Sequence, residues 1–268
     1  MNMIALAPTS LPNTEPLEYI DAASKAGYEA IGIRLFRSPG LRYGFFPVAG
    51  NAALMQEVRS AIADAGLEVY DILSFYMQPE MDLESMVPAL EFGAEIGAQY
   101  ALVIGDDPEW GRMVENFTRF CETAGRLGMG AAIEAPVVSR VVNTLPLAVK
   151  LIDESGSRNA GISIDPFQFT RAGHTPGLIK QFDRKYFPYT QINDGIAESG
   201  FCMVGEGTAP LGDMLDALPQ DLPLSLECPA PRDSNYSAEE WARTALSGTR
   251  RWLEQYYAAR ARASSPRN

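Results

Sequence analysis

The chain has 268 residues, of which 46% are hydrophobic, and its 34 acidic and 22 basic side chains give a net charge of −12. This acidity argues against binding nucleic acid, because phosphate contacts need a basic face. No apolar run approaches the roughly 20 residues of a membrane-spanning helix, so we expect neither nucleic acid nor a membrane as a partner.

The predicted elements alternate between strand and helix. Four glycines, Gly27, Gly66, Gly97 and Gly128, each stand between a helical stretch and a β-branched strand, as expected for the left-handed residue that ends a helix. Continuing this pattern predicts eight strands, near residues 3–7, 30–35, 68–74, 100–105, 130–134, 161–165, 189–193 and 223–227. A last helix is expected around 238–259.

Eight strand–helix units in about 250 residues predict an α/β fold, a single (β/α)₈ TIM barrel. An open doubly wound sheet is the competing fold, but no Gly-x-Gly-x-x-Gly follows the first strand. We expect the barrel to occupy residues 1–258 and the tail at 259–268 to be disordered. The three cysteines lack metal-ligand spacing, which favours reduced thiols in a cytoplasmic protein.

Polar residues stand near the carboxyl ends of the last four predicted strands, where apolar residues would be expected. Glu134, Asp165 and Glu227 end strands five, six and eight, and Gln191 lies close to the end of strand seven. Each alternates with apolar neighbours, so the period of two places all four inside the barrel. Active sites of TIM barrels form at this end.

Three converging carboxylates would repel one another and be costly to remove from water. A divalent cation removes that cost, and an oxygen-rich set suits Mn²⁺, Mg²⁺ or Co²⁺ better than Zn²⁺. We therefore expect one divalent cation on Glu134, Asp165, Gln191 and Glu227. A single strand-end acid is more often a helix N-cap or an ion-pair partner, but four on consecutive strands are hard to obtain by chance.

Several motifs occur in a characteristic order. They are Ala132-Ile133-Glu134, Gly161-Ile162-Ser163-Ile164-Asp165 with Gly173 following, Gln191-Ile192-Asn193-Asp194, Gly205-Glu206-Gly207 and Leu224-Ser225-Leu226-Glu227. Together they resemble the xylose-isomerase-like barrel superfamily, which includes the sugar-phosphate isomerases and epimerases. The resemblance implies that Glu134 and Glu227 both bind the metal and move protons, and that Asp165 is only a ligand.

The chain departs from that family pattern at three positions. Gln191 replaces the usual histidine of strand seven, Gln168 stands where histidine is frequent, and Arg34 ends strand two, where an acid is usual. Glutamine as the strand-seven ligand resembles the family's dehydratases of cyclic ketones, such as dehydroshikimate or inosose dehydratases. The chain differs from those dehydratases in having no histidine at position 168.

Further candidates lie near the expected mouth of the barrel. Arg34 is expected to meet polar or anionic substrate groups, or else to pair with a site carboxylate. His174 and Glu206 are also candidates for contacting the substrate. The alternative for His174 is an ordinary residue of a surface loop, and the alternative for Glu206 is an ordinary turn residue. Phe36, Tyr76 and Trp110 are expected in loops near the mouth, where they either wall the pocket or simply pack against their neighbours. The substrate-binding set is therefore Arg34, Gln168, His174, Glu206, Arg232 and Tyr76.

The leading hypothesis is a metal-dependent isomerase or epimerase of a small polyhydroxylated carbonyl compound, acting through an enediolate. The alternative enzyme is a metal-dependent dehydratase of a cyclic keto-polyol or keto-acid. A non-catalytic barrel that binds a small ligand is the third class, and the paired acids Glu134 and Glu227 argue against it. The expected partner is a small-molecule substrate, and monomer and homo-oligomer both stay open.

Overall fold

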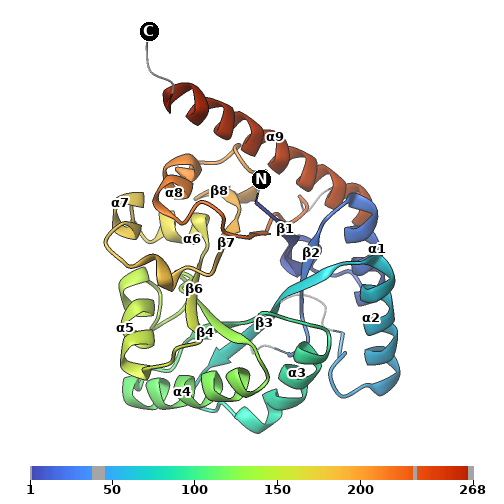
Figure 1. Cartoon of the computed structure of the whole chain (residues 1–268), viewed down its shortest axis with the longest axis vertical. Coiled ribbons are helices and arrows are strands. Elements are labelled where there is room, and N and C mark those ends of the chain that lie inside the picture. The colour runs from blue at the N-terminus through green and yellow to red at the C-terminus, as the bar shows by residue number, and fades with distance from the viewer. Residues whose placement is uncertain (1, 38–45, 232–233, 265–268) are drawn as a thin grey trace.

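Eight parallel strands close into a barrel in the computed structural model, which describes residues 2–37, 46–231 and 234–264 (Figure 1). Around the barrel the strands follow the order β1-β10-β7-β6-β5-β4-β3-β2, so sequence neighbours pair except where a hairpin is inserted. The predicted (β/α)₈ barrel is thus confirmed. The barrel strands are β1 Ile4–Leu6, β2 Ala30–Ile33, β3 Glu68–Met77, β4 Tyr100–Gly105, β5 Gly130–Glu134, β6 Ala160–Ile164, β7 Tyr189–Ile192 and β10 Leu224–Leu226.

Helices surround the barrel, and a small antiparallel hairpin interrupts the connection from β7 to β10. The hairpin consists of β8 Asp194–Ile196 and β9 Gly200–Cys202. The α-helices are α1 Pro16–Ala26, α2 Ala52–Ala65, α3 Leu83–Glu95, α4 Trp110–Arg126, α5 Leu145–Ser155, α6 Pro166–Arg171, α7 Pro176–Ile179, α8 Leu211–Ala217 and α9 Ala238–Ser264. The described residues also form two 3₁₀ turns, η1 Pro8–Ser10 and η2 Arg184–Tyr186.

The last helix, α9, packs beside α1 and closes the ring of helices (Figure 1). It continues to Ser264, past residue 258, so most of the segment expected to be disordered is helical. Among the described residues, no helix has the length and apolar character needed to cross a membrane.

Glycine ends the helices where the sequence pattern indicated it. Gly27 has a φ of 89° and its N–H donates to the carbonyl oxygens of Ala23 and Ser24, which closes α1. Gly66 closes α2 in the same way with a φ of 65°. A side chain is strained at these angles, so glycine allows the short turn into the next strand.

The hydrophobic core has two parts, separated by the barrel wall. The larger part lies between strands and helices and takes the outward side chains, such as Ile31, Ile33 and Leu35 of the second strand segment. The smaller part fills the barrel interior, where the rings of Tyr70 and Tyr189 lie 5.1 Å apart between centroids and Tyr100 packs on both. Because these tyrosines block the amino-terminal half of the barrel, an internal site must lie nearer the carboxyl ends of the strands.

Candidate active site

The four predicted ligands all lie at the carboxyl-terminal mouth of the barrel. Glu134 is the last residue of β5, Asp165 directly follows β6, and Glu227 directly follows β10. Gln191 of β7 pairs with Ser225 of β10, and both are buried. The neighbours of these groups, Ile133, Ile164, Ile192 and Leu226, belong to the outer core, so the alternation places the polar groups inside.

The three carboxyl groups influence one another strongly. Burial raises the pKa of Glu227 to about 8, and the charge of Asp165 adds to this. Burial also raises the pKa of Glu134 well above its usual value, with further contributions from the charges of Glu227 and Asp165. The three groups therefore share one poorly solvated region, in which simultaneous ionisation is unfavourable without a positive charge.

Asp165 has a second, structural role at the start of α6. Its Oδ1 accepts a hydrogen bond from the backbone N–H of Gln168 at 2.8 Å, so it is the N-cap of this helix. Asn193 supports the same turn, because its Oδ1 accepts the N–H of Phe167 at 3.0 Å. The hydrogen bond from Gln168 partly offsets the effect of burial, which raises the pKa of Asp165 to about 6. The N-cap role, which the sequence analysis gave as the alternative, is therefore confirmed for Asp165. The same side chain is also the predicted metal ligand.

Gln191 is oriented by Glu134. Its Nε2 donates to Oε2 of Glu134 at 3.3 Å, while its Oε1 is buried and has no hydrogen-bond partner among the described residues. A buried amide oxygen without a partner is costly, and a hard cation would satisfy it.

The side chains as they stand do not form a finished ligand cage. Within the described ranges, no three His, Cys, Asp or Glu side chains come together closely enough to hold a metal ion. The donor types nevertheless fit a divalent cation, since carboxylates and one unpaired amide oxygen are oxygen ligands.

Arg34 and Tyr76 lie close to these acids. The positive charge of Arg34 lowers the pKa of Glu227, and both Arg34 and Glu134 act on the pKa of Tyr76, which burial raises. Tyr76 belongs to β3, so its expected place in a loop was wrong. A β-bulge and a strand longer than predicted carry it to the mouth as part of the barrel wall.

The two other aromatic residues expected around the pocket lie elsewhere. Phe36 stacks on Phe75 with ring centroids 5.5 Å apart and packs against the outer core. Trp110 begins α4, where its ring lies under Lys150 at 4.2 Å and its Nε1 donates to Glu154. These rings pack in the outer layer, so the prediction that they wall the pocket was wrong.

His174 lies on the outer side of β6. It packs against the ring of Phe169, and burial lowers its pKa. Its buried Nε2 has no hydrogen-bond partner among the described residues and adjoins a cavity of about 20 Å³, large enough for one water molecule. Ile162 and Ile164, which face the outer core, line the same cavity. Gln168 is half-buried, and its unpaired Oε1 leaves it available for a polar ligand.

The Gly-Glu-Gly motif is organised by a buried acid. The carboxylate of Asp194 accepts the backbone N–H groups of Gly195, Gly205, Gly207 and Ala209 at 2.9 to 3.1 Å. Glu206 points outward from this loop and is exposed, and its N–H donates to Met203 in a turn.

Arg232, another predicted substrate contact, lies outside the described residues.

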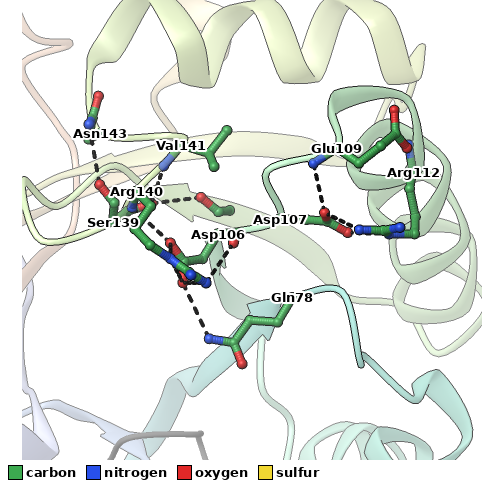
Figure 2. A network of polar contacts seen from close by, with 10 residues as sticks. Gln78, Asp106, Asp107, Glu109, Arg112, Ser139, Arg140, Val141 and Asn143 are labelled. Atoms are coloured by element: carbon green, nitrogen blue, oxygen red, sulfur yellow. Dashed lines mark hydrogen bonds and ion pairs between the residues drawn. The ribbon is translucent and has the colours of Figure 1, made fainter.

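A polar network next to the mouth was missed from the sequence (Figure 2). Asp106, directly after β4, accepts hydrogen bonds from the backbone N–H of Arg140 at 2.8 Å, from its guanidinium and from Gln78. Ser139 donates to the carbonyl of Gly105 at 2.7 Å. The network fixes the loop that follows Glu134, and the polar Asp106-Asp107 pair after a strand was the signal that could have revealed it.

Comparisons with solved structures support the fold. A xylose isomerase-like TIM barrel/4-hydroxyphenylpyruvate dioxygenase fusion protein matches with a TM-score of 0.78 and 19% identity over 100% of this chain, which spans 45% of the fusion. The IolI protein with a bound zinc atom matches with a TM-score of 0.76 and 18% identity, over 95% of this chain and 99% of IolI. An L-ribulose 3-epimerase matches with a TM-score of 0.73 and 18% identity, over 100% of both chains.

Sequence comparisons agree with the fold. No curated protein matches the chain. A family model described as xylose isomerase-like TIM barrel matches residues 20–256, which cover all the barrel strands except β1. The chain therefore belongs to the xylose isomerase-like TIM barrel family.

Proposed function

We propose that this protein is a divalent-metal-dependent isomerase or epimerase of a small polyhydroxylated carbonyl compound. The observation that carries the proposal is the group of three carboxyls at the barrel mouth, with the unpaired oxygen of Gln191 beside them. Family membership supports it, as do the zinc atom bound to IolI and the epimerase activity named for the L-ribulose 3-epimerase, two proteins of the same fold.

The residues that would hold the cation are Glu134, Asp165, Gln191 and Glu227. A bound divalent cation supplies Lewis acidity, which polarises a carbonyl oxygen and acidifies the neighbouring C–H. Mn²⁺, Mg²⁺ and Co²⁺ are the ions that this oxygen-rich set favours.

Glu134 and Glu227 are the two groups suited to move the proton. They are half-buried at the mouth, and burial raises the pKa of both, that of Glu227 to about 8, so both hold a proton more readily than an exposed glutamate. One glutamate takes the proton from the carbon next to the carbonyl, and the other returns a proton to the opposite face or to the neighbouring carbon. The first outcome is epimerisation and the second is aldose–ketose isomerisation.

Arg34, Tyr76 and Gln168 are the candidates for holding the substrate. Arg34 and Tyr76 lie within electrostatic range of the two glutamates. Their guanidinium and hydroxyl groups suit the hydroxyl and carbonyl oxygens of a sugar-like molecule.

A panel of ketoses, aldoses and cyclic keto-polyols in D₂O, followed by NMR, tests the proposal. The expected result is metal-dependent deuterium uptake at a carbon next to a carbonyl, with a rearranged sugar as product. Loss of water from a cyclic keto-polyol or keto-acid would instead establish the dehydratase that Gln191 favours. Absence of exchange across the panel with metal-loaded protein would contradict both.

We propose that the protein works in the cytoplasm, where cysteines such as Cys121, Cys202 and Cys228 stay reduced. We propose a small molecule as the only partner that the reaction requires.

A further inference from the structure

Another buried acid, Asp71 of β3, lies inside the barrel beneath the mouth. The register between β2 and β3 shifts there, from Ile31 opposite Val69 to Gly32 opposite Asp71, so Tyr70 is an extra residue in β3. Tyr70 belongs to the interior cluster, and the Asp71 side chain is also inside the barrel, with 2% of its surface exposed. The bulge thus turns two consecutive side chains inward, which simple alternation forbids.

Asp71 forms no ion pair and accepts no hydrogen bond from a basic side chain in the described part of the chain. Tyr189 donates its hydroxyl hydrogen to Oδ2 at 2.8 Å. The other oxygen, Oδ1, is buried without a hydrogen-bond partner in the described part of the chain. It lies against Gly32, where a Cβ atom would stand only 2.3 Å away. Glycine at position 32 therefore provides the space that the carboxylate occupies.

The groups facing Asp71 come from β3, β5, β7 and α1 and from the residue that follows β10. They are Tyr70 of β3 itself, Tyr189 of β7, Tyr19 of α1, and the mouth acids Glu134 and Glu227. The charge of Asp71 raises the pKa of both glutamates, so it reaches the mouth electrostatically. Tyr189 stands two residues before Gln191, which corresponds to about 6–7 Å along a strand.

We propose that Asp71 is a remote fourth carboxylate of the cation site, which does not touch the divalent cation but strengthens its binding through its negative charge. This inference rests on the proposed metal dependence. In a poorly solvated barrel, a charge one residue layer below the mouth keeps a substantial attraction for a divalent ion. Burial raises the pKa of Asp71 to about 6, so the group is ionised at pH 8 even without a cation.

The competing explanation is structural: Asp71 serves only to accept the hydrogen bond of Tyr189 and to orient β7. Charge and hydrogen bond can be separated by two variants. Asp71→Asn removes the charge and keeps an acceptor for Tyr189, whereas Tyr189→Phe keeps the charge and removes the hydrogen bond.

The experiment is a titration of Mn²⁺ into the metal-free full-length protein at pH 8 under argon, with free Mn²⁺ followed by electron paramagnetic resonance. We expect Asp71→Asn to weaken Mn²⁺ binding about tenfold and Tyr189→Phe to change it less than twofold. A matched control is Asp153→Asn, since Asp153 accepts a hydrogen bond from Tyr186 on the outside of the barrel. This control removes the same charge and should leave the affinity unchanged.

Each outcome decides the inference. Equal affinity in wild type and Asp71→Asn overturns it while the proposed metal dependence stands, and equal losses in Asp71→Asn and Tyr189→Phe assign Asp71 the structural role. Wild-type protein that binds no Mn²⁺ overturns both the inference and the metal dependence. Circular dichroism checks the fold, and Asp71→Leu provides a second uncharged variant of similar size if Asp71→Asn does not fold.

Discussion

Glu134 ends β5 and Glu227 follows β10, two strands that do not pair with each other, and yet the charge of Glu227 raises the pKa of Glu134. Replacing either glutamate by glutamine keeps the shape and removes the proton acceptor. We expect Glu134→Gln and Glu227→Gln each to lower the rate of proton exchange by about 10²–10⁴. Exchange measured by NMR in D₂O checks this on folded, metal-loaded variants.

Glu95→Gln is the control for this prediction, since Glu95 forms an exposed ion pair with Arg59 far from the mouth. Its exchange rate should equal that of wild type. A Glu134→Gln or Glu227→Gln variant with wild-type exchange would remove that glutamate from the mechanism.

Gln191 is the clearest residue-level departure from the family pattern. An amide oxygen favours harder ions than an imidazole nitrogen does, and it does not compete for protons near pH 6.5. Gln191→His should tighten the binding of Co²⁺ and Ni²⁺ and make metal affinity fall more steeply as the pH drops. Calorimetric titration of several metals measures both effects. An unchanged order of affinities with an unchanged pH slope would show that Gln191 does not touch the metal.

The connection between β7 and β10 shows how an element is held in place near the site. Its loop wraps around the Asp194 carboxylate, and a Cβ atom at Gly207 would lie 2.1 Å from Oδ1 of Asp194. Gly207→Ala should therefore cost about 1–3 kcal/mol of unfolding free energy, because the crowded loop must shift. Urea denaturation measures the change.

Gly212→Ala is the matched control in the same connection. Gly212 is helical in α8, and a Cβ atom there would approach Tyr256 no closer than 3.5 Å. Alanine should be neutral or stabilise the protein by up to about 1 kcal/mol. Equal destabilisation by both substitutions would contradict the role given to Asp194.

At the scale of the whole molecule, the sequence predicted the barrel and its eight strands because periodic apolar strands and helix-ending glycines are local signals. The mouth position of Glu134, Asp165, Gln191 and Glu227 followed from alternation and strand order alone. The inward position of Asp71 did not, because a bulge breaks the alternation on which such a prediction depends. The prediction that Trp110 walls the pocket was wrong for another reason. Trp110 contacts Lys150 and Glu154 of a neighbouring helix, and contacts between helices depend on tertiary packing.

The buried acids also affect the stability of the whole metal-free protein. The pKa of Glu227 is about 8 in the folded state and near 4.5 in the unfolded chain, and that of Asp71 is about 6 against 3.8. Between these values the folded state holds protons that the unfolded state has lost, so raising the pH from about 5 to 8 should lower stability. Thermal unfolding in the presence of a chelator measures this trend.

Saturating Mn²⁺ should reverse the pH trend, because a cation favours the ionised carboxylates. The variant Glu227→Gln should show a shallower fall in melting temperature than wild type over the same pH range. Stability that rises steadily from pH 5 to 8 in the metal-free wild type would contradict the assignment of raised pKa values to these acids.

The central claim is that four residues at the barrel mouth hold one divalent cation. Its most direct test is elemental analysis of protein purified without chelator and then dialysed against Mn²⁺ and metal-free buffer in turn. We expect about one equivalent of divalent metal in wild type and less than about a tenth of that in Glu227→Ala. Equal metal content in wild type and variant, or none in wild type, would contradict it.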